Sequence, residues 1–241
     1  KCDWSSDVCS SDLPLRLTRD QHVAIAPAGV ALYSAGYICV YQAESHLPSG
    51  LVAVGYSASP LLAMFGMRMF FREPITLRML VGSLFGIVGI VLVFRPEFAR
   101  LAHSQDAVLG AAYTALAVLI STIGGLLAHR NHHRGLHGWP SMVWGMLYGA
   151  LFAFAAALLL GRPITIGTSP AYIVSLVYLA LFGSVLAFAA WLTLMGRIGP
   201  ASASYVGVMV PVVALLVSTL FENLVWHPMM FIGIAVSVAG N

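Results

Sequence analysis

The feature that most constrains this chain is an internal duplication marked by one proline and two glycines. The three pairs lie 151 residues apart and are Pro60 with Pro211, Gly82 with Gly233, and Gly89 with Gly240. Both copies therefore keep the same spacing, and both lie in strongly apolar sequence. We call this separation the repeat shift. A repeated apolar unit of this size indicates a membrane protein built from two related halves that enclose one path.

Composition agrees with a chain whose surface faces lipid. Hydrophobic residues make up 59% of the chain and charged residues only 9%, whereas soluble domains carry about 25% charged residues. The net charge of +3 comes from basic residues in separate loops, which argues against a nucleic-acid surface. The three cysteines have no metal-ligand spacing and indicate no disulfide framework.

Continuous apolar runs predict membrane-spanning helices, because a bilayer core needs about 20 apolar residues per helix and a barrel would show alternation instead. The eight expected spans are 23–43, 50–71, 76–94, 107–128, 139–160, 171–192, 201–220 and 226–241. The repeat shift maps the first three spans onto the last three, so one repeat is five spans long. Because five is odd, the two repeats have opposite orientations. We expect an all-α multipass bundle, a ten-helix inverted-repeat (5+5) fold with the first two helices missing.

The repeat also predicts how the chain is divided. Residues 1–13 are polar, differ in character from the apolar sequence after them, and resemble a translated adapter, so we interpret them as a non-native tail. Residues 14–94 are expected to hold three helices of the first repeat. Residues 107–241 are expected to hold the second repeat, truncated at its C-terminus because the last span is still apolar at Asn241.

Arginine placement gives an independent orientation, because cytoplasmic loops carry excess Lys and Arg. One set of alternate loops holds Arg16, Arg19, Arg68, Arg72, Arg78, Arg130, Arg134 and Arg197; the other holds Arg95, Arg100 and Arg162. The larger set, eight arginines against three, is predicted to be cytoplasmic.

Two segments carry a family resemblance, SASPLLAMFGMRMFFREPITLRMLVGSLFGIVGIVLVF and YLALFGSVLAFAAWLTLMGRIGPASASYVGVMVPVVALLVSTLFENLVWHPMMFIGIAVSVAGN. Each has a helix with a central proline, a glutamate at its far end, then a helix with paired glycines. This order resembles the EamA domain of the drug/metabolite transporter superfamily over about residues 22–241. One departure is that Glu73 lies further along the chain from Pro60 than Glu222 lies from Pro211.

The resemblance implies ten helices around a central cavity in the bacterial cytoplasmic (inner) membrane. It implies transport, most often export, of small metabolites, amino acids or drugs by alternating access. Its partners are then a small-molecule substrate and the lipid bilayer. No cofactor, resident metal or catalytic residue is expected, and no ATP-binding P-loop pattern is present.

Two prolines inside spans point to a substrate path. A helix-interior proline frees the carbonyl four residues back, here that of Tyr56 or Gly207, and such a helix should face protein or a wet cavity. Polar residues lie beside each proline, so the path candidates are Tyr56, Ser57, Ser59, Pro60, Ser202, Ser204, Tyr205 and Pro211. Tyr33 and Tyr37 join them because their spacing of four places both on one helix face, although we favour interhelical packing for this pair.

Small residues predict close helix contacts. Gly82 and Gly86 form a small-xxx-small pattern, and Gly233 with Ser237 repeats it; the repeat glycines Gly89 and Gly240 are expected to pack in the same way. The contact is either within one chain or the face of a homodimer.

A histidine-rich loop provides the competing hypothesis. His129, His132, His133 and His137 have a metal-like spacing that is similar to histidine boxes of membrane desaturases. The remaining histidines are isolated, so a two-iron enzyme site is not assembled, and a solvated basic loop is favoured. The alternatives are therefore a membrane-embedded metal-dependent enzyme using this loop, or an inactive gene fragment.

Overall fold

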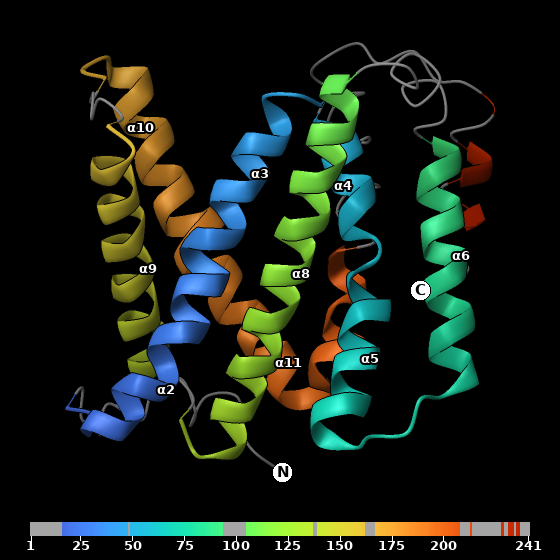
Figure 1. Cartoon of the computed structure of the whole chain (residues 1–241), viewed down its shortest axis with the longest axis horizontal. Helices are drawn as coiled ribbons and strands as arrows, with labels where there is room; N and C mark the ends of the chain where they lie inside the picture. The colour runs from blue at the N-terminus through green and yellow to red at the C-terminus, as the bar shows by residue number, and fades with distance from the viewer. Residues whose placement is uncertain are drawn as a thin grey trace. The chain divides into compact units, whose positions relative to one another are not determined.

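The computed structural model describes residues 16–47, 49–93, 105–136, 139–161 and 167–207, with residues 213, 228, 231–233 and 235–236 beyond them. Every regular element among these residues is helical. The elements are α2 (Arg19–Val30), η1 (Ala31–Ala35), α3 (Gly36–Glu44), α4 (Ser49–Tyr56), α5 (Ser59–Phe71), α6 (Leu77–Val93), α8 (Gln105–His133), α9 (Trp139–Leu159), α10 (Pro170–Tyr178), η2 (Leu179–Leu186) and α11 (Ala187–Ala203), as labelled in Figure 1. The predicted tail 1–13, Pro211, Glu222, Gly240 and His137 lie outside the described residues.

Five helical stretches among the described residues are long and apolar enough to cross a membrane. They run over Arg19–Glu44, Leu51–Phe71, Asp106–His133, Trp139–Leu159 and Pro170–Ala203, and a shorter apolar helix covers Leu77–Gly89. The prediction of an all-helical multipass chain is therefore confirmed in this coarse form. The first six expected spans each overlap one of these helices.

The boundary between the sixth and seventh expected spans differs from the prediction. The sixth span was expected to end at residue 192, but α11 continues without interruption to Ile198. The break comes at Gly199, which is non-helical with φ 80° and ψ 160°, a region open to glycine and strained for other residues. Pro200 then begins the next helical segment, where a missing N–H is tolerated. Local backbone chemistry, and not the apolar run, sets this boundary.

The chain divides into two compact units. Unit 1 holds residues 1–35 and 127–199, and unit 2 holds residues 36–126 and 200–241. The divisions fall inside the stretch from α2 to α3, inside α8, and at the Gly199 break in α11. Unit 1 holds the first part of the first span together with the sixth span, and unit 2 holds the second span together with the start of the seventh, so each unit pairs segments related by the repeat shift.

Unit 1 is built on the close packing of α2 against α9, which run side by side in Figure 1. The helices meet at Gly29 and Gly145, so closely that a Cβ on Gly29 would lie 2.6 Å from the Cα of Gly145. One turn further along α9, a Cβ on Gly149 would lie 2.8 Å from the Cβ of Tyr33. Small residues permit this approach of two backbones. This close contact between α2 and α9 was not predicted, although Gly145 and Gly149 form a GxxxG pattern in the sequence.

Unit 2 contains two buried apolar clusters. The first gathers Ala43, Leu47, Leu51, Val52 and Val54 around the turn between α3 and α4. The second joins Ala63, Met64 and Met67 of α5 to Leu126 of α8 and Ala201 of α11. The loop 72–76 joins α5 to α6 at one end of unit 2 (Figure 1). These clusters fix α4 and α5 in place, which positions the polar residues described below.

The outer surface of α10 and η2 is apolar and exposed. Neither element contains a buried residue, and large side chains such as Val174 and Phe182 are more than half exposed. Exposed apolar helices of this length are expected where lipid replaces water.

Candidate functional site

The helix that carries Pro60 is broken inside its membrane-spanning stretch. The segment α4 ends at Tyr56, Ser57 and Ala58 form a turn, and α5 begins at Ser59 with Pro60 in its first turn. Pro60 lies inside the apolar span Leu51–Phe71 as expected, but at the first turn of α5 and not in the interior of an unbroken helix. At the first turn of a helix the missing N–H breaks no intrahelical hydrogen bond, so the chain turns instead of kinking.

The turn is stabilised by its own polar groups. The Ser57 hydroxyl donates to the carbonyl oxygen of Val54 at 2.6 Å, and the backbone N–H groups of Ser57 and Ala58 donate to Val54 and Gly55. Ser57 is completely buried and Pro60 nearly so, while Ser59 is half-buried. These hydrogen bonds matter because a backbone N–H or C=O group without a partner in an apolar environment costs free energy.

Tyr56, at the end of α4, contacts two other elements of unit 2. Its hydroxyl lies 3.2 Å from the hydroxyl of Ser121 on α8. Its carbonyl oxygen lies 3.6 Å from where a Cβ on Gly207 would stand. The repeat shift converts position 56 into position 207, so equivalent positions of the two repeats meet here.

Tyr205 makes a different kind of contact. Its hydroxyl donates to the carbonyl oxygen of Met79 on α6 at 2.6 Å and lies 2.9 Å from the hydroxyl of Ser83. The neighbouring Ser204 donates to the carbonyl of Pro200 at 2.7 Å. Ser202 and Ser204 are half-buried. Tyr205 therefore anchors the seventh span to the third, which is a packing role.

The two tyrosines expected on one helix face fall in different units. Tyr33 lies in η1 and packs in unit 1, where its ring meets Phe188 edge-on with centroids 4.7 Å apart. Tyr37 lies in α3 of unit 2 and is 42% exposed. The structure supports the packing interpretation for Tyr33.

The π-helical turns themselves are duplicated. Applying the repeat shift to Ala31–Ala35 gives 182–186, which lies inside η2 (Leu179–Leu186). Both copies therefore widen their helix at the same place. Such turns occur frequently at functional sites, and nothing in the sequence pattern signals them.

The predicted glycine contacts can be located in part. On α6, Gly86 and Gly89 are buried and Gly82 is half-buried, and the helix packs against α4 and α5. Gly233 is also buried. Their proposed role in packing stays a prediction.

The histidine-rich segment forms the last turn of α8, not a loop. His129 and His133 approach each other through their Nε2 atoms at 3.0 Å, and a Cβ on Gly196 would meet the ring of His132. Among the described residues no group of three or more His, Cys, Asp or Glu could hold a metal ion. Within the described residues, therefore, no assembled metal centre supports the hypothesis of a metal-dependent enzyme.

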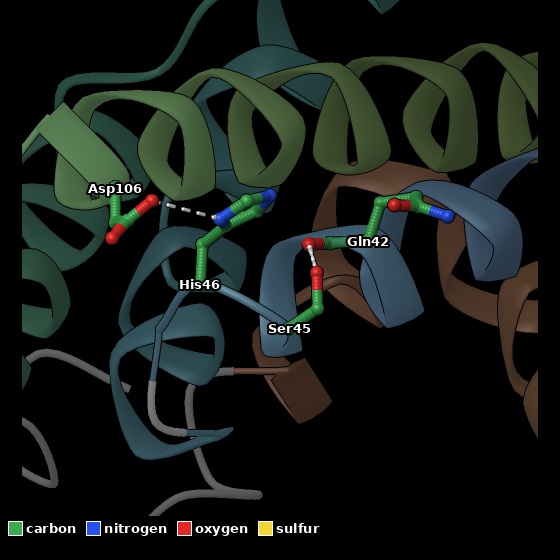
Figure 2. A network of polar contacts seen from close by, with 4 residues as sticks. All are labelled: Gln42, Ser45, His46 and Asp106. Carbon is green, nitrogen blue, oxygen red and sulfur yellow. Dashed lines mark hydrogen bonds and ion pairs between the residues drawn. The ribbon is translucent and has the colours of Figure 1, made fainter.

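A polar network lies where α3 leads toward α4 (Figure 2). His46 Nδ1 lies 3.4 Å from Asp106 Oδ1 at the start of α8, and the His46 ring stacks on Tyr113. Ser45 donates to the carbonyl of Gln42 at 2.7 Å. The arginine count predicts that this end faces outward, where ionisable groups find water. Glu73, at the opposite end of the second span, is also exposed.

Comparison with known proteins identifies the chain. The profile of the EamA-like transporter family matches residues 11–95 and 108–241. The chain belongs to the EamA-like transporter family. The match covers both copies of the duplication and most of the described helices.

Relatives of this EamA-like chain include proteins named as a transporter and as an exporter. It is 29% identical over 199 residues to "Uncharacterized inner membrane transporter YedA" of Escherichia coli, covering 79% of the chain and 60% of YedA. It is 27% identical to "Protein PecM" of Dickeya dadantii, covering 77% of the chain and 61% of PecM. It is 28% identical over 218 residues to "Probable terminal-alkyne amino-acid exporter" of Streptantibioticus cattleyicolor, covering 90% and 70%. The chain thus spans less than two thirds of the length of YedA and of PecM.

A solved crystal structure shares the fold of this EamA-like chain. The TM-score is 0.75 at 18% identity, and the likeness covers 94% of this chain and 75% of the other. Together with the apolar helices, the family places the chain in the inner membrane as a multipass protein. The family description and the name of YedA are those of transporters, which points away from an enzyme.

Proposed function

We propose that the protein is a secondary carrier that exports a small organic solute across the inner membrane by alternating access. Its architecture is a ten-helix inverted repeat, in which residues 14–94 belong to the first repeat and 107–241 to the second. In such folds substrate sites lie near the midplane, at the interface of the repeats and beside interrupted helices. The Ser57–Ala58 turn is an interruption of this kind.

The observation that carries the proposal is the contact between Tyr56 and Gly207. Around a twofold axis, a residue on the axis meets its own equivalent. Here the equivalent residues approach each other, since the Tyr56 carbonyl oxygen lies 3.6 Å from where a Cβ on Gly207 would stand, and each lies four positions before a repeat proline. The duplicated widening at η1 and η2 supports the same relation independently.

The residues closest to this crossing are the best candidates for the solute path. Tyr56, Ser57, Ser59 and Pro60 surround the turn between α4 and α5, and Tyr37 is an exposed aromatic of the same unit. Pro60 begins a separate helical segment, so α4 and α5 can change their mutual angle without breaking a hydrogen bond at that position. We assign Pro60 the role of a hinge, with Pro211 as its counterpart.

The substrate class follows from chemistry and kinship together. Hydroxyl and aromatic side chains at the turn suit an uncharged or zwitterionic solute with a polar and an apolar part. A relative named as an amino-acid exporter supports amino acids and similar metabolites or drugs as the first class to test.

Cysteine accessibility tests the inverted repeat. Glu73→Cys and Glu222→Cys are introduced singly after Cys2, Cys9 and Cys39 are replaced by serine. A membrane-impermeant maleimide on intact cells should label the second variant and should reach the first only after permeabilisation. Labelling of both positions from the same side contradicts the inverted repeat.

Flux tests the transport activity. The full chain in proteoliposomes should exchange labelled neutral amino acids faster than protein-free liposomes. A well-folded, correctly oriented protein that moves neither amino acids nor aromatic drugs would reject the carrier assignment.

A further inference from the structure

Two imidazole nitrogens meet at the end of α8 at the separation of paired metal ligands. His129 and His133 lie four residues apart on one helix face, with their Nε2 atoms 3.0 Å apart. The rings are perpendicular, with an interplanar angle of 90° and centroids 4.4 Å apart. This contact is a hydrogen bond while one of the two nitrogens carries the proton.

The distance between the two Nε2 atoms fits some metal coordination geometries better than others. Metal–imidazole bonds are about 2.1 Å long. Two such bonds at a right angle place their nitrogens about 3.0 Å apart, whereas a tetrahedral angle places them about 3.4 Å apart. The observed 3.0 Å therefore fits neighbouring positions of a square-planar or octahedral ion. Cu²⁺ and Ni²⁺ favour these geometries and accept imidazole readily.

The surroundings permit an ion to enter. His129 is 6% exposed, but His133 is exposed, so water reaches the pair from one side. Arg130 and Arg134 flank the site and oppose a cation, but both are exposed and screened by solvent. The C-terminal end of a helix carries a partial negative charge, which favours a cation there. The remaining coordination positions would be filled by water.

We propose that His129 and His133 form a bidentate site for Cu²⁺ or Ni²⁺ at the end of α8. Binding requires both rings in the tautomer that keeps the proton on Nδ1, so that both Nε2 lone pairs face the ion. The bound ion ties the last turn of α8 together. This site involves no catalysis and does not depend on the transport proposal.

Metal titration of the full chain tests the site. The protein is purified in detergent without a histidine tag, with Cys2, Cys9 and Cys39 replaced by serine because thiolates bind the same ions. CuCl₂, NiCl₂ and ZnCl₂ are titrated by calorimetry, and the Cu²⁺ complex is examined by electron paramagnetic resonance. We expect Cu²⁺ to bind most tightly, Zn²⁺ least tightly, and the Cu²⁺ spectrum to show two nitrogen ligands.

Matched variants separate this pair from other histidines. His133→Ala changes an exposed residue and should weaken Cu²⁺ binding at least tenfold, as should His129→Ala if that variant folds. His132→Ala, in the same turn, and His46→Ala, in unit 2, should retain the affinity of the parent. Equal Cu²⁺ affinity in His133→Ala and the parent overturns the proposal, as does a spectrum with one nitrogen ligand.

Discussion

Units 1 and 2 each pair two repeat-related spans, but different chemistry stabilises each unit. In unit 1, α2 and α9 approach through Gly29, Gly145 and Gly149, and the side chain of Tyr33 packs beside the contact. In unit 2, the interrupted helix of α4 and α5 carries buried hydroxyls and a tyrosine that reaches α8. Backbone contact without side chains leaves no room for movement or solute. We expect the polar groups around the turn in unit 2 to allow movement and to bind a solute.

The difference indicates where function should be sought. A tight glycine contact tolerates little change, because any added atom meets backbone rather than a mobile side chain. The turn at Ser57–Ala58 has satisfied hydrogen bonds that do not depend on a continuous helix. We therefore expect substitutions in unit 1 to act on stability and substitutions at the turn to act on transport.

The largest stability effect should come from Gly29→Ala. Its new Cβ would meet the backbone of Gly145, and overpacking of this kind costs about 3 kcal/mol at the upper end of its usual range. The measurement is the thermal unfolding midpoint of the detergent-solubilised protein. Gly183→Ala is the control, because its Cβ would stand 3.7 Å from Leu179, an ordinary contact. Equal midpoints for the two variants would show that α2 and α9 do not pack as described.

The largest transport effect should come from Pro60→Ala. Restoring an N–H at the start of α5 favours a continuous helix across the turn, and we expect a flux about tenfold lower, equivalent to about 1.4 kcal/mol in the barrier. Flux in proteoliposomes is compared at matched protein amounts. Pro170→Ala, at the exposed start of α10, is the control and should transport normally. Unchanged flux in Pro60→Ala would remove the hinge from the mechanism.

A smaller, more selective effect should separate two tyrosines. Tyr56→Phe loses the contact with Ser121, and Tyr205→Phe loses the hydrogen bonds to Met79 and Ser83. Each change should cost about 1 kcal/mol of stability. Only Tyr56→Phe should also alter the apparent affinity for solute. If Tyr205→Phe shifts affinity and Tyr56→Phe does not, the path lies closer to α6 than we propose.

The smallest effect should come from the outer network in Figure 2. The Asp106 side chain is 72% exposed, and exposed ion pairs contribute about 0–1 kcal/mol. Asp106→Asn should therefore change the unfolding midpoint by little at low salt and not at all at high salt. A large change that persists in high salt would place Asp106 in a buried role.

Much of the fold was accessible from the sequence because lipid imposes a simple rule. Each crossing needs a long apolar helix, so the spans near 23–43, 50–71 and 139–160 could be placed within a few residues. The duplication and the family resemblance followed from residue order and spacing. The path candidates around Pro60 were chosen in the same way, because polar residues beside a proline are conspicuous in apolar sequence, and their role stays a prediction.

Only the tertiary structure decided what each residue contacts. Helical periodicity assigns Tyr33 and Tyr37 to one face, but the two residues belong to different compact units, and Tyr33 packs on Phe188. Proline chemistry allows Pro60 either to kink a helix or to begin one, and the turn at Ser57 selects the second. Tyr56 and Gly207 meet through contacts between distant parts of the chain, which no local pattern encodes. Apolar spacing specifies which residues enter the membrane, whereas packing of one helix on another specifies which of them touch.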